Sequence, residues 1–450
     1  MSQSQLPLGI LTIGRKRPGF DQQWNQVMLD GAAAALRALG VKTAGGSAPV
    51  VDEETTRVAL EKLRQAGCAT LLVLQPSMGN GHLGLTVAQR WTGPVVLWAT
   101  PERPEGEKVS SCSLVAQHLW ASMMRQLNRP FEFVYGDPGA NEVRAALTRA
   151  IGVCGAFAQL RGARVGLAGA HAPGFVAMEA DPFAMQNQLG VQLHRLSLAQ
   201  FMERVTGLAD AAVRDDVDRV RSLNLPMNNV TAADLPMQSR LYLAMRELMA
   251  EETLDALAVQ DWPEFGATLG QWPYLAMSRL ADENAVVAME GDADGAVTAL
   301  AGQSLGAGMG YLTDWLEHDA RTIHFWHAGM APLGWIQKPS LGRHFNIEKP
   351  MVVDGPLAPD QPITAARLWR VDGRYKATAF ECKTIRNPRE MTGNTALVEV
   401  PPANIPGGDV RGWFDELLHA GLPHHVALFH GLHRDAFRRL ARMMRVEWVG

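Results

Sequence analysis

The sequence predicts an α/β fold in which two Rossmann-like parallel-sheet domains precede a C-terminal, mainly antiparallel β domain with a barrel-like part. Three observations support this fold. The chain has 450 residues, which is too long for one compact core and allows two or three domains. Its first half alternates short β-branched runs with helical patterns, as βαβ units do. After about residue 335, prolines and period-two strands replace the helices.

The N-terminal domain, residues 1–150, is expected to contain a parallel sheet with helices on both faces. Its predicted strands are short apolar runs: Leu8–Ile13, Thr70–Leu74, Pro94–Ala99 and Phe131–Tyr135. Its predicted helices show apolar residues at helical spacing: Gln22–Leu39, Thr55–Ala66 and Ser113–Leu127.

A second series of α/β elements predicts the middle domain, residues 151–285. The series begins with a helix near Ala140–Gln159, and no Ser/Gly-rich linker marks the junction. The predicted strands of this domain are Arg164–Leu167, Gln192–Arg195 and Ala256–Gln260.

The C-terminal domain, residues 286–450, is expected to carry the chemical motifs and the barrel-like part. Ile363–Val371 and Arg374–Ile385 flank Asp372-Gly373, a dipeptide suited to the positive φ angles of a tight hairpin. A helix at Arg434–Met444 is predicted near the end of the chain.

The composition excludes several classes of function. The formal charge is only -4, and the sequence contains no run of five or more lysines and arginines, so nucleic acid is not expected as a partner. No signal-peptide pattern or membrane-spanning stretch is found, and four cysteines are scattered singly. We therefore expect a cytoplasmic protein.

Acids and histidines follow or end several short apolar runs in the chain. Glu290 follows the predicted strand Ala285–Met289, and the carboxyl end of such a strand is where open α/β folds bind ligands. Asp314 and His327 end two further runs within forty residues. Each has a plain structural alternative: the acids near Glu290 can cap a helix, Asp314 can lie in a surface turn, and His327 can be half buried in a strand.

His424 and His425 precede another apolar run, Val426–Phe429. Adjacent side chains in a strand face opposite ways, so at most one of the two histidines can point at a shared centre. Carboxylates together with imidazoles suit a divalent ion such as Mn²⁺, which accepts hard oxygen and borderline nitrogen ligands. The sequence therefore predicts a divalent metal site.

Four ordered motifs resemble the L-fucose isomerase and L-arabinose isomerase superfamily. These motifs are Gln260–Glu264 (QDWPE), Glu290–Gly295 (EGDADG), Trp326–Gly329 (WHAG) and Pro423–His425 (PHH). The similarity extends over nearly the whole chain. It implies a metal-dependent aldose–ketose isomerase that acts on a pentose or a 6-deoxyhexose through an ene-diol intermediate.

The resemblance also implies a role for individual residues. The metal ligands would be Glu290, Asp314, His327 and His425, with His424 as the alternative for the last position, and Mn²⁺ is the expected metal. Glu290 and Asp314 would also carry protons during catalysis. Aspartate at the second acid position follows the fucose type, whereas His327 follows the arabinose type, so the sugar is left open.

The expected partners are a small sugar and further copies of the chain. In the resembled family the first domain of one subunit reaches the site of its neighbour, which implies a homo-oligomer, a trimer or hexamer, with Arg17 and His82 contacting substrate. Trp262, Glu264 and Trp326 are assigned to substrate binding because they lie within the motifs; packing in the core is the alternative for the tryptophans. Two competing functions stay open: a non-catalytic sugar-binding or sugar-sensing protein, and a related metal-dependent epimerase or lyase.

Overall fold

The computed structural model describes residues 7–16, 19–46 and 48–450. The chain divides into two compact units, Met1–Gln159 (unit 1) and Leu160–Gly450 (unit 2). Residues 160–285 of the predicted middle domain lie in unit 2 together with the whole predicted C-terminal domain, whereas residues 151–159 lie in unit 1. The division into three domains stays a prediction.

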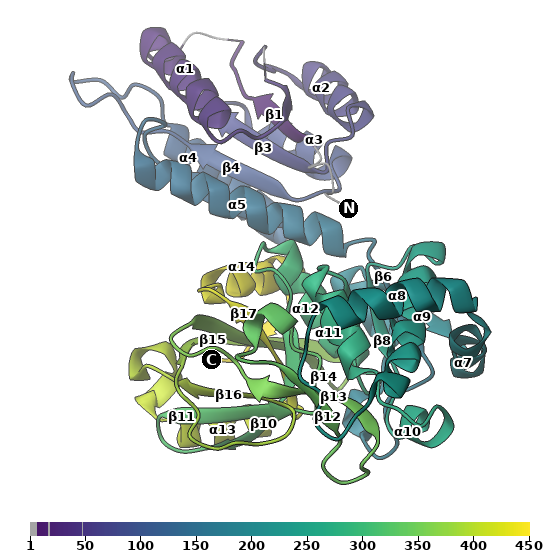
Figure 1. The fold of residues 1–450 in the computed structure, drawn as a ribbon. Helices are drawn as coiled ribbons and strands as arrows, with labels where there is room; N and C mark the ends of the chain where they lie inside the picture. Colours follow the sequence, from purple (N-terminus) through teal and green to yellow (C-terminus); the bar gives the residue numbers. More distant parts are fainter. Residues whose placement is uncertain (1–6, 17–18, 47) are drawn as a thin grey trace. The chain divides into compact units, whose positions relative to one another are not determined.

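Unit 1 contains a parallel sheet with the strand order β2-β1-β3-β4-β5 (Figure 1). The strands are β1 (Leu8–Thr12), β2 (Thr43–Gly45), β3 (Thr70–Gln75), β4 (Val95–Ala99) and β5 (Phe131–Tyr135). The helices are α1 (Gln22–Ala38), α2 (Glu53–Gln65), α3 (Gly81–Arg90), α4 (Ser113–Gln126) and α5 (Asn141–Leu160), which ends at the unit boundary.

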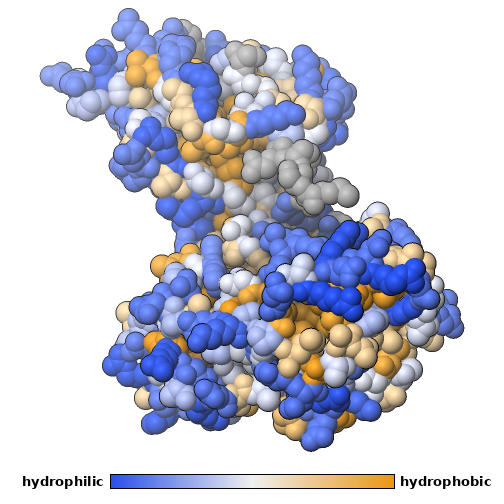
Figure 2. Space-filling view, in the orientation of Figure 1, coloured by the Kyte–Doolittle hydropathy of each residue, from blue (hydrophilic) through white to orange (hydrophobic). Residues whose placement is uncertain are grey.

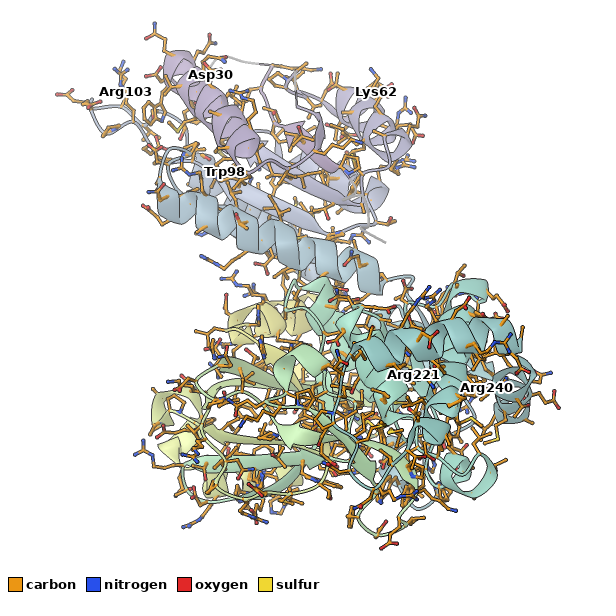
Figure 3. All side chains as sticks on the ribbon, viewed as in Figure 1. Asp30, Lys62, Trp98, Arg103, Arg221 and Arg240 are labelled. Carbon is orange, nitrogen blue, oxygen red and sulfur yellow. The ribbon has the colours of Figure 1, made fainter. Side chains whose placement is uncertain are left out.

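Helices cover both faces of this sheet, as predicted. Leu60 of α2, Val87 of α3 and Trp120 of α4 belong to one buried cluster with Leu71 and Leu97 of the strands. Right-handed crossovers place α1 on the opposite face, because the chain moves from β1 to β2 in the other direction. Figure 3 shows side chains such as those of Lys62 and Asp30 on the outside of the unit.

Unit 2 begins with a second parallel sheet, in the order β7-β6-β8-β9. Its strands are β6 (Arg164–Ala168), β7 (Gln192–Leu196), β8 (Ala256–Val259) and β9 (Val286–Ala288). The accompanying helices are α6 (Pro182–Ala184), α7 (Leu198–Gly207), α8 (Asp210–Ser222), α9 (Leu235–Glu251), α10 (Glu264–Thr268), α11 (Tyr274–Asp282) and α12 (Ala293–Ser304).

The rest of unit 2 forms a mixed sheet that closes on itself. Each of the strands β16, β11, β10, β17, β14 and β15 pairs antiparallel with the next, and β15 pairs back with β16. The bounds are β10 (Tyr311–His318), β11 (Thr322–His327), β12 (Ser340–Arg343), β13 (Pro350–Pro356), β14 (Pro362–Val371), β15 (Arg374–Thr384), β16 (Asn394–Glu399), α13 (Val410–His419), β17 (His425–His430), α14 (Arg434–Met444) and β18 (Glu447–Trp448). This closed ring confirms the predicted barrel-like part.

The hairpin between β14 and β15 forms where the sequence predicts it. Asp372 has φ 51° and Gly373 has φ 70°, so both central residues adopt the positive angles that a tight two-residue turn needs. Buried helix α12 packs against β8 and β9 on one side and against β14 and β17 of the ring on the other. The carboxyl edge of the parallel sheet is thereby held beside the ring.

Three local expectations differ from the structure. The prediction omits β2, a three-residue strand at the sheet edge, and α3, which follows Gly79 and Asn80. It places Asp314 at the end of an apolar run, whereas β10 continues to His318. The strand continues because Trp315, the next residue, is buried and pairs with Phe325 of β11. After a bulge, β10 pairs with β11 again from Glu317 onward.

The surface of each unit is largely hydrophilic in the view of Figure 2. Among the residues that the structure describes, no helix combines the length and apolar character needed to cross a bilayer. The cytoplasmic location stays a prediction.

Candidate metal centre

Glu290 is fixed at the carboxyl edge of the second parallel sheet by its backbone. Its N–H donates to Oδ1 of Asp261 at 2.6 Å, and its carbonyl accepts the N–H of Ala172 at 2.8 Å. The next residue, Gly291, donates to the carbonyl of Val259 at 2.8 Å. Glu290 itself has φ 57°, a left-handed conformation that is costly for a residue with a long side chain. The loops after β6, β8 and β9 therefore fix the backbone from which the Glu290 side chain projects.

The barrel strands supply the other predicted ligands. Asp314 of β10 lies directly opposite His425 of β17 in the antiparallel register, so the two side chains project from the same face. His327 is the last residue of β11, the strand on the other side of β10.

The polar ends of these side chains converge. Nε2 of His327 lies 3.8 Å from Oε1 of Glu290, and Nε2 of His425 lies 3.4 Å from Oε2 of the same carboxylate. Nε2 of His425 also lies 3.5 Å from Oδ1 of Asp314. Ligands about 2.0–2.2 Å from a divalent ion lie roughly 3–4 Å from one another, so these separations match a shared ion.

The adjacent histidine, His424, has a more peripheral position. Its Nε2 lies 4.0 Å from Oδ1 of Asp314, and its side chain is 38% exposed, whereas that of His425 is fully buried. The ring packs edge-on against Phe175 at 4.8 Å. His425 contacts both acids, so it is the better placed of the two predicted alternatives.

A layer of buried side chains orients His425. Its Nδ1–H donates to Oδ2 of Asp292 at 2.9 Å, which leaves Nε2 facing Glu290 and Asp314. Asp292 in turn accepts two hydrogen bonds from Arg367, at 2.7 and 2.9 Å, and caps α12 by accepting the N–H of Gly295. A carboxylate that fixes the tautomer and orientation of a histidine is typical of metal centres.

Arg367 and the contact between Asp292 and His425 were not predicted. Helix capping by Asp292 or Asp294 is the structural alternative that the sequence offers for this segment, and Asp292 does cap α12 by accepting the N–H of Gly295. Arg367 interrupts the buried strand residues Ala365, Ala366 and Leu368, and a charge at such a position is a signal for a buried ion pair.

The charges of the cluster shift the pKa values of its members in opposite directions. Burial disfavours the ionised form of Glu290, but the imidazoles of His327 and His425 outweigh it and hold the Glu290 pKa well below its usual range. Burial likewise disfavours the imidazolium of His425, yet the carboxylates of Asp292 and Glu290 raise the His425 pKa to about 10. Burial and the nearby charge of His425 lower the His424 pKa to about 4.

Several buried polar atoms of the cluster have no hydrogen-bond partner among the described residues. They include Oε2 of Glu290, Nε2 of His425 and Nδ1 of His327. Unpaired buried polar atoms are costly, and here two of them face one another across the cluster. A divalent cation coordinated by the oxygen and the nitrogen would satisfy both, so the residues fit a metal ion.

Asp261 is a further buried acid that the sequence analysis did not single out, although it lies inside the Gln260–Glu264 motif. Its Oδ1 accepts the N–H of Glu290, and burial raises the Asp261 pKa to about 7. The ring of Tyr274 lies edge-on to that of His327 at 5.7 Å. Both residues support the position of a candidate ligand.

Aromatic side chains line up beside the cluster. The ring of Trp326 lies 5.9 Å from that of His327 and 5.4 Å from that of Phe345. Trp262 stacks on the buried Trp272 at 4.6 Å. The two predicted substrate-binding tryptophans are half buried, so each has one part in the core and another part that is accessible.

The remaining predicted substrate residues are not placed at this cluster. Glu264 begins α10 and accepts a hydrogen bond from Gln260 at 2.7 Å. His82 is an exposed residue of α3 in unit 1. Arg17 lies outside the described residues. Their roles stay predictions.

Comparison with known proteins gives relatives over most of the chain. No family model matches. The sequence is 24% identical over 407 residues to the sulfoquinovose isomerases of Priestia aryabhattai and Priestia megaterium, which covers 88% of this chain and 89% of each relative. The sulfoquinovose isomerase of Alkalicoccus urumqiensis is 24% identical over 379 residues, 83% of this chain and 84% of the relative. The chain is similar to sugar isomerases.

This similarity confirms the prediction of an enzyme of the isomerase class. These relatives are named sulfoquinovose isomerases, so membership of the L-fucose isomerase and L-arabinose isomerase superfamily stays a prediction.

Proposed function

We propose that the chain is a metal-dependent aldose–ketose isomerase whose cation is held by Glu290, Asp314, His327 and His425. The observation that carries the proposal is the convergence of these ligand atoms. Those of Glu290, His327 and His425 all lie within 4.8 Å of one another, and so do those of Asp314, His424 and His425.

The donor set indicates what kind of ion would be bound. Carboxylate oxygens combined with imidazole nitrogens favour a divalent ion such as Mn²⁺, and no cysteine takes part. When bound, the cation would act as a Lewis acid and stabilise negative charge on the sugar oxygens.

The protein side chains would move the proton between C1 and C2 of the open-chain sugar. The low pKa of Glu290 keeps its carboxylate ionised, so the carboxylate can accept a proton. Because Glu290 is only 8% exposed, the sugar would have to lie directly against it for the proton to move from carbon. The side chain of Asp314 is 26% exposed and lies on the opposite side of His425 from Asp292. We assign the two acids, Glu290 and Asp314, to proton transfer in the ene-diol pathway.

For the substrate we propose a 6-deoxyhexose, with sulfoquinovose as the first candidate. Sulfoquinovose is a 6-deoxyhexose with a sulfonate at C6, and the relatives are named for its isomerisation. The sugar class expected from the sequence, a pentose or a 6-deoxyhexose, includes this carbon skeleton. Assembly into a homo-oligomer is part of the proposal and rests on the family resemblance.

The test is removal of metal followed by its return. We would dialyse the protein against a chelator, add Mn²⁺, and follow ketose formation from sulfoquinovose, L-fucose and L-arabinose. We expect turnover of one of these sugars that disappears with the chelator and returns with Mn²⁺. Full turnover in the chelated protein would contradict the metal-dependent mechanism, and sugar binding without turnover would assign a non-catalytic sugar-binding protein instead.

A further inference from the structure

The loop after β6, residues 169–175, contacts the candidate metal centre at two points. The N–H of Ala172 donates to the carbonyl of Glu290 at 2.8 Å. The ring of Phe175 packs edge-on against that of His424, with 4.8 Å between the ring centroids. The position of this loop therefore affects both the backbone that carries one candidate ligand and the imidazole next to another.

The side chain of Gln260, at the end of β8, fixes the start of this loop. Its Oε1 accepts the N–H of Ala170 at 2.8 Å. A Cβ atom at Gly169 would lie only 2.4 Å from Oε1, so the amide packs directly against the loop backbone. The carbonyl of Ala170 in turn lies against the loop after β9, since a Cβ atom at Gly291 would be 1.9 Å from its oxygen. Gln260 therefore ties two loops of the metal centre to the sheet.

Glu264 determines which way the Gln260 amide points. Nε2 of Gln260 donates to Oε1 of Glu264 at 2.7 Å. An amide has one accepting and one donating end, and an ionised carboxylate only accepts. The carboxylate therefore binds the NH₂ group and leaves the amide oxygen for the N–H of Ala170.

The carboxylate of Glu264 has no free oxygen for a sugar hydroxyl. Its Oε1 accepts the bond from Gln260, and its Oε2 is buried without a hydrogen-bond partner among the described residues. An atom that water does not reach is not accessible to a sugar either. These contacts favour a role through Gln260 over the direct contact with substrate that the sequence predicts for Glu264.

We propose that Gln260 and Glu264 are positioning residues that hold the loop after β6 against Glu290 and His424. The carboxylate orients the amide, the amide binds the loop, and the loop supports the metal centre from the side of the parallel sheet. This inference deepens the proposed function and rests on it, because the loop is supported at the centre that would hold the catalytic ion.

The test compares Glu264→Ala with Glu264→Gln in the full chain loaded with Mn²⁺. Alanine removes the acceptor, whereas the carbonyl of glutamine can still accept the bond from Gln260. Gln260→Ala and the double variant Gln260→Ala with Glu264→Ala complete a double-mutant cycle. Glu252→Ala is the matched control, because Glu252 is an exposed carboxylate of the same unit. The measurements are hydrogen exchange of residues 169–175, Mn²⁺ affinity by chelator competition, and kcat and KM for sulfoquinovose.

We expect both single alanine variants to speed the exchange of residues 169–175 about two- to tenfold, the effect of one lost hydrogen bond. Mn²⁺ affinity and kcat should each fall about tenfold while KM changes little, as for other residues that support metal ligands. The double variant should be no worse than either single variant, since all three break the same contact. Glu264→Gln should restore most of the loss, and Glu252→Ala should match the wild-type protein.

A Glu264→Gln variant as impaired as Glu264→Ala, with a raised KM, would place the carboxylate on the sugar and overturn the proposal. Unchanged exchange of residues 169–175 in both alanine variants, or losses that add in the double variant, would also overturn it. Hydrogen exchange needs no turnover, so a failure of the proposed isomerase activity is distinguished from a failure of this inference.

Discussion

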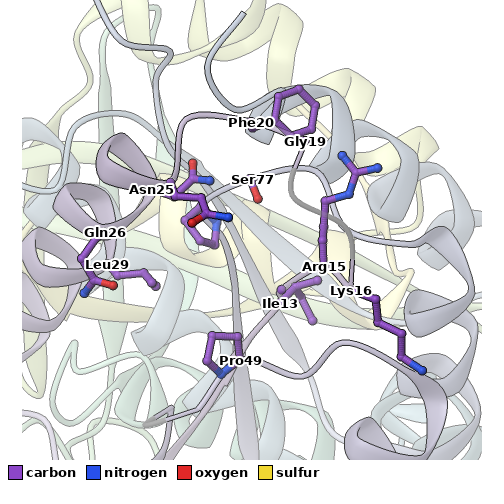
Figure 4. Close-up of a pocket in the computed structure, with 13 residues that line it drawn as sticks. Ile13, Arg15, Lys16, Gly19, Phe20, Asn25, Gln26, Leu29, Pro49 and Ser77 are labelled. Carbon is purple, nitrogen blue, oxygen red and sulfur yellow. The ribbon is translucent and has the colours of Figure 1, made fainter.

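Two parallel sheets in this molecule place polar residues at the same structural position, the carboxyl edge, yet the two edges carry different kinds of charged side chain. At the edge in unit 2, Glu290 meets histidines from the barrel strands, and the cluster is almost fully buried. At the edge in unit 1, Arg15 and Lys16 are exposed and face a cavity without carboxylates among its described lining residues (Figure 4). The same topology therefore presents acids and imidazoles at one edge and cationic side chains at the other.

The two edges also differ in how their charged groups are supported. His425 in unit 2 is oriented by Asp292, which is held by Arg367, so each charge depends on another buried charge. Among the described residues, Arg15 in unit 1 packs over the ring of Phe20 and forms no ion pair. We therefore expect substitutions in the buried cluster of unit 2 to have larger effects than substitutions at exposed positions, and the following predictions test this difference, from the largest expected effect to the smallest.

The largest effect is expected for Glu290→Gln. The amide cannot accept the proton, so kcat for sugar isomerisation should fall about 10²–10⁴-fold while the fold is retained. The measurement is steady-state turnover together with circular dichroism. Glu252→Gln serves as control, since Glu252 is an exposed carboxylate of the same unit. Substantial turnover in Glu290→Gln would remove this residue from the proton-transfer role.

Arg367→Met tests whether the buried layer supports the cluster. The substitution leaves the carboxylate of Asp292 buried without its cation, which should reduce the free energy of unfolding by about 3–5 kcal/mol. Arg221→Met is the matched control, because Arg221 pairs with Asp218 at the surface and its side chain is 58% exposed (Figure 3). Urea denaturation checks both variants, and equal midpoints would show that the pair of Arg367 and Asp292 contributes little.

The affinity for Mn²⁺ should depend on pH. In the metal-free protein the His425 pKa is raised to about 10, so below that pH the imidazole holds a proton that the cation must displace. Each unit decrease in pH between 8.5 and 6.5 should therefore weaken Mn²⁺ binding about tenfold. Chelator competition at several pH values measures this slope, and a flat profile would contradict His425 as a ligand.

The smallest effect is expected at the edge of the cluster. Nε2 of His424 lies 4.0 Å from the carboxylate of Asp314, and the ring is neutral at pH 7 because the His424 pKa is lowered to about 4. His424→Gln should weaken Mn²⁺ binding no more than a few-fold, whereas His425→Gln should weaken it about 10–100-fold or more. Equal losses in the two variants would mean that both histidines bind the ion.

Much of the fold can be predicted from sequence patterns, because periodicity and turn residues are local signals. Phe131–Tyr135 and Arg434–Met444 have the predicted bounds, and the Asp372-Gly373 turn is where the dipeptide places it. The closure of the barrel is a different matter. It depends on strands that are far apart in the sequence, such as β10 and β17, where Tyr311 lies opposite Leu428, and such pairs leave no local pattern.

The candidate site shows the same division. Glu290 can be located because an apolar strand precedes it, and that inference needs only one segment. Arg367 and Asp261 cannot be assigned from their own segments, since their importance comes from Asp292 and Glu290, which lie 75 and 29 positions away. Long-range partners of this kind become visible only when the strands are placed in space.

The central claim is that side chains from β10, β11, β17 and the loop after β9 share one divalent ion. The most direct test is a crystal of the Mn²⁺-loaded protein measured on both sides of the manganese absorption edge. The account predicts one anomalous peak per chain, in bonding contact with Glu290, Asp314, His327 and His425. A peak bound elsewhere, or none in protein that isomerises sugar, would contradict it.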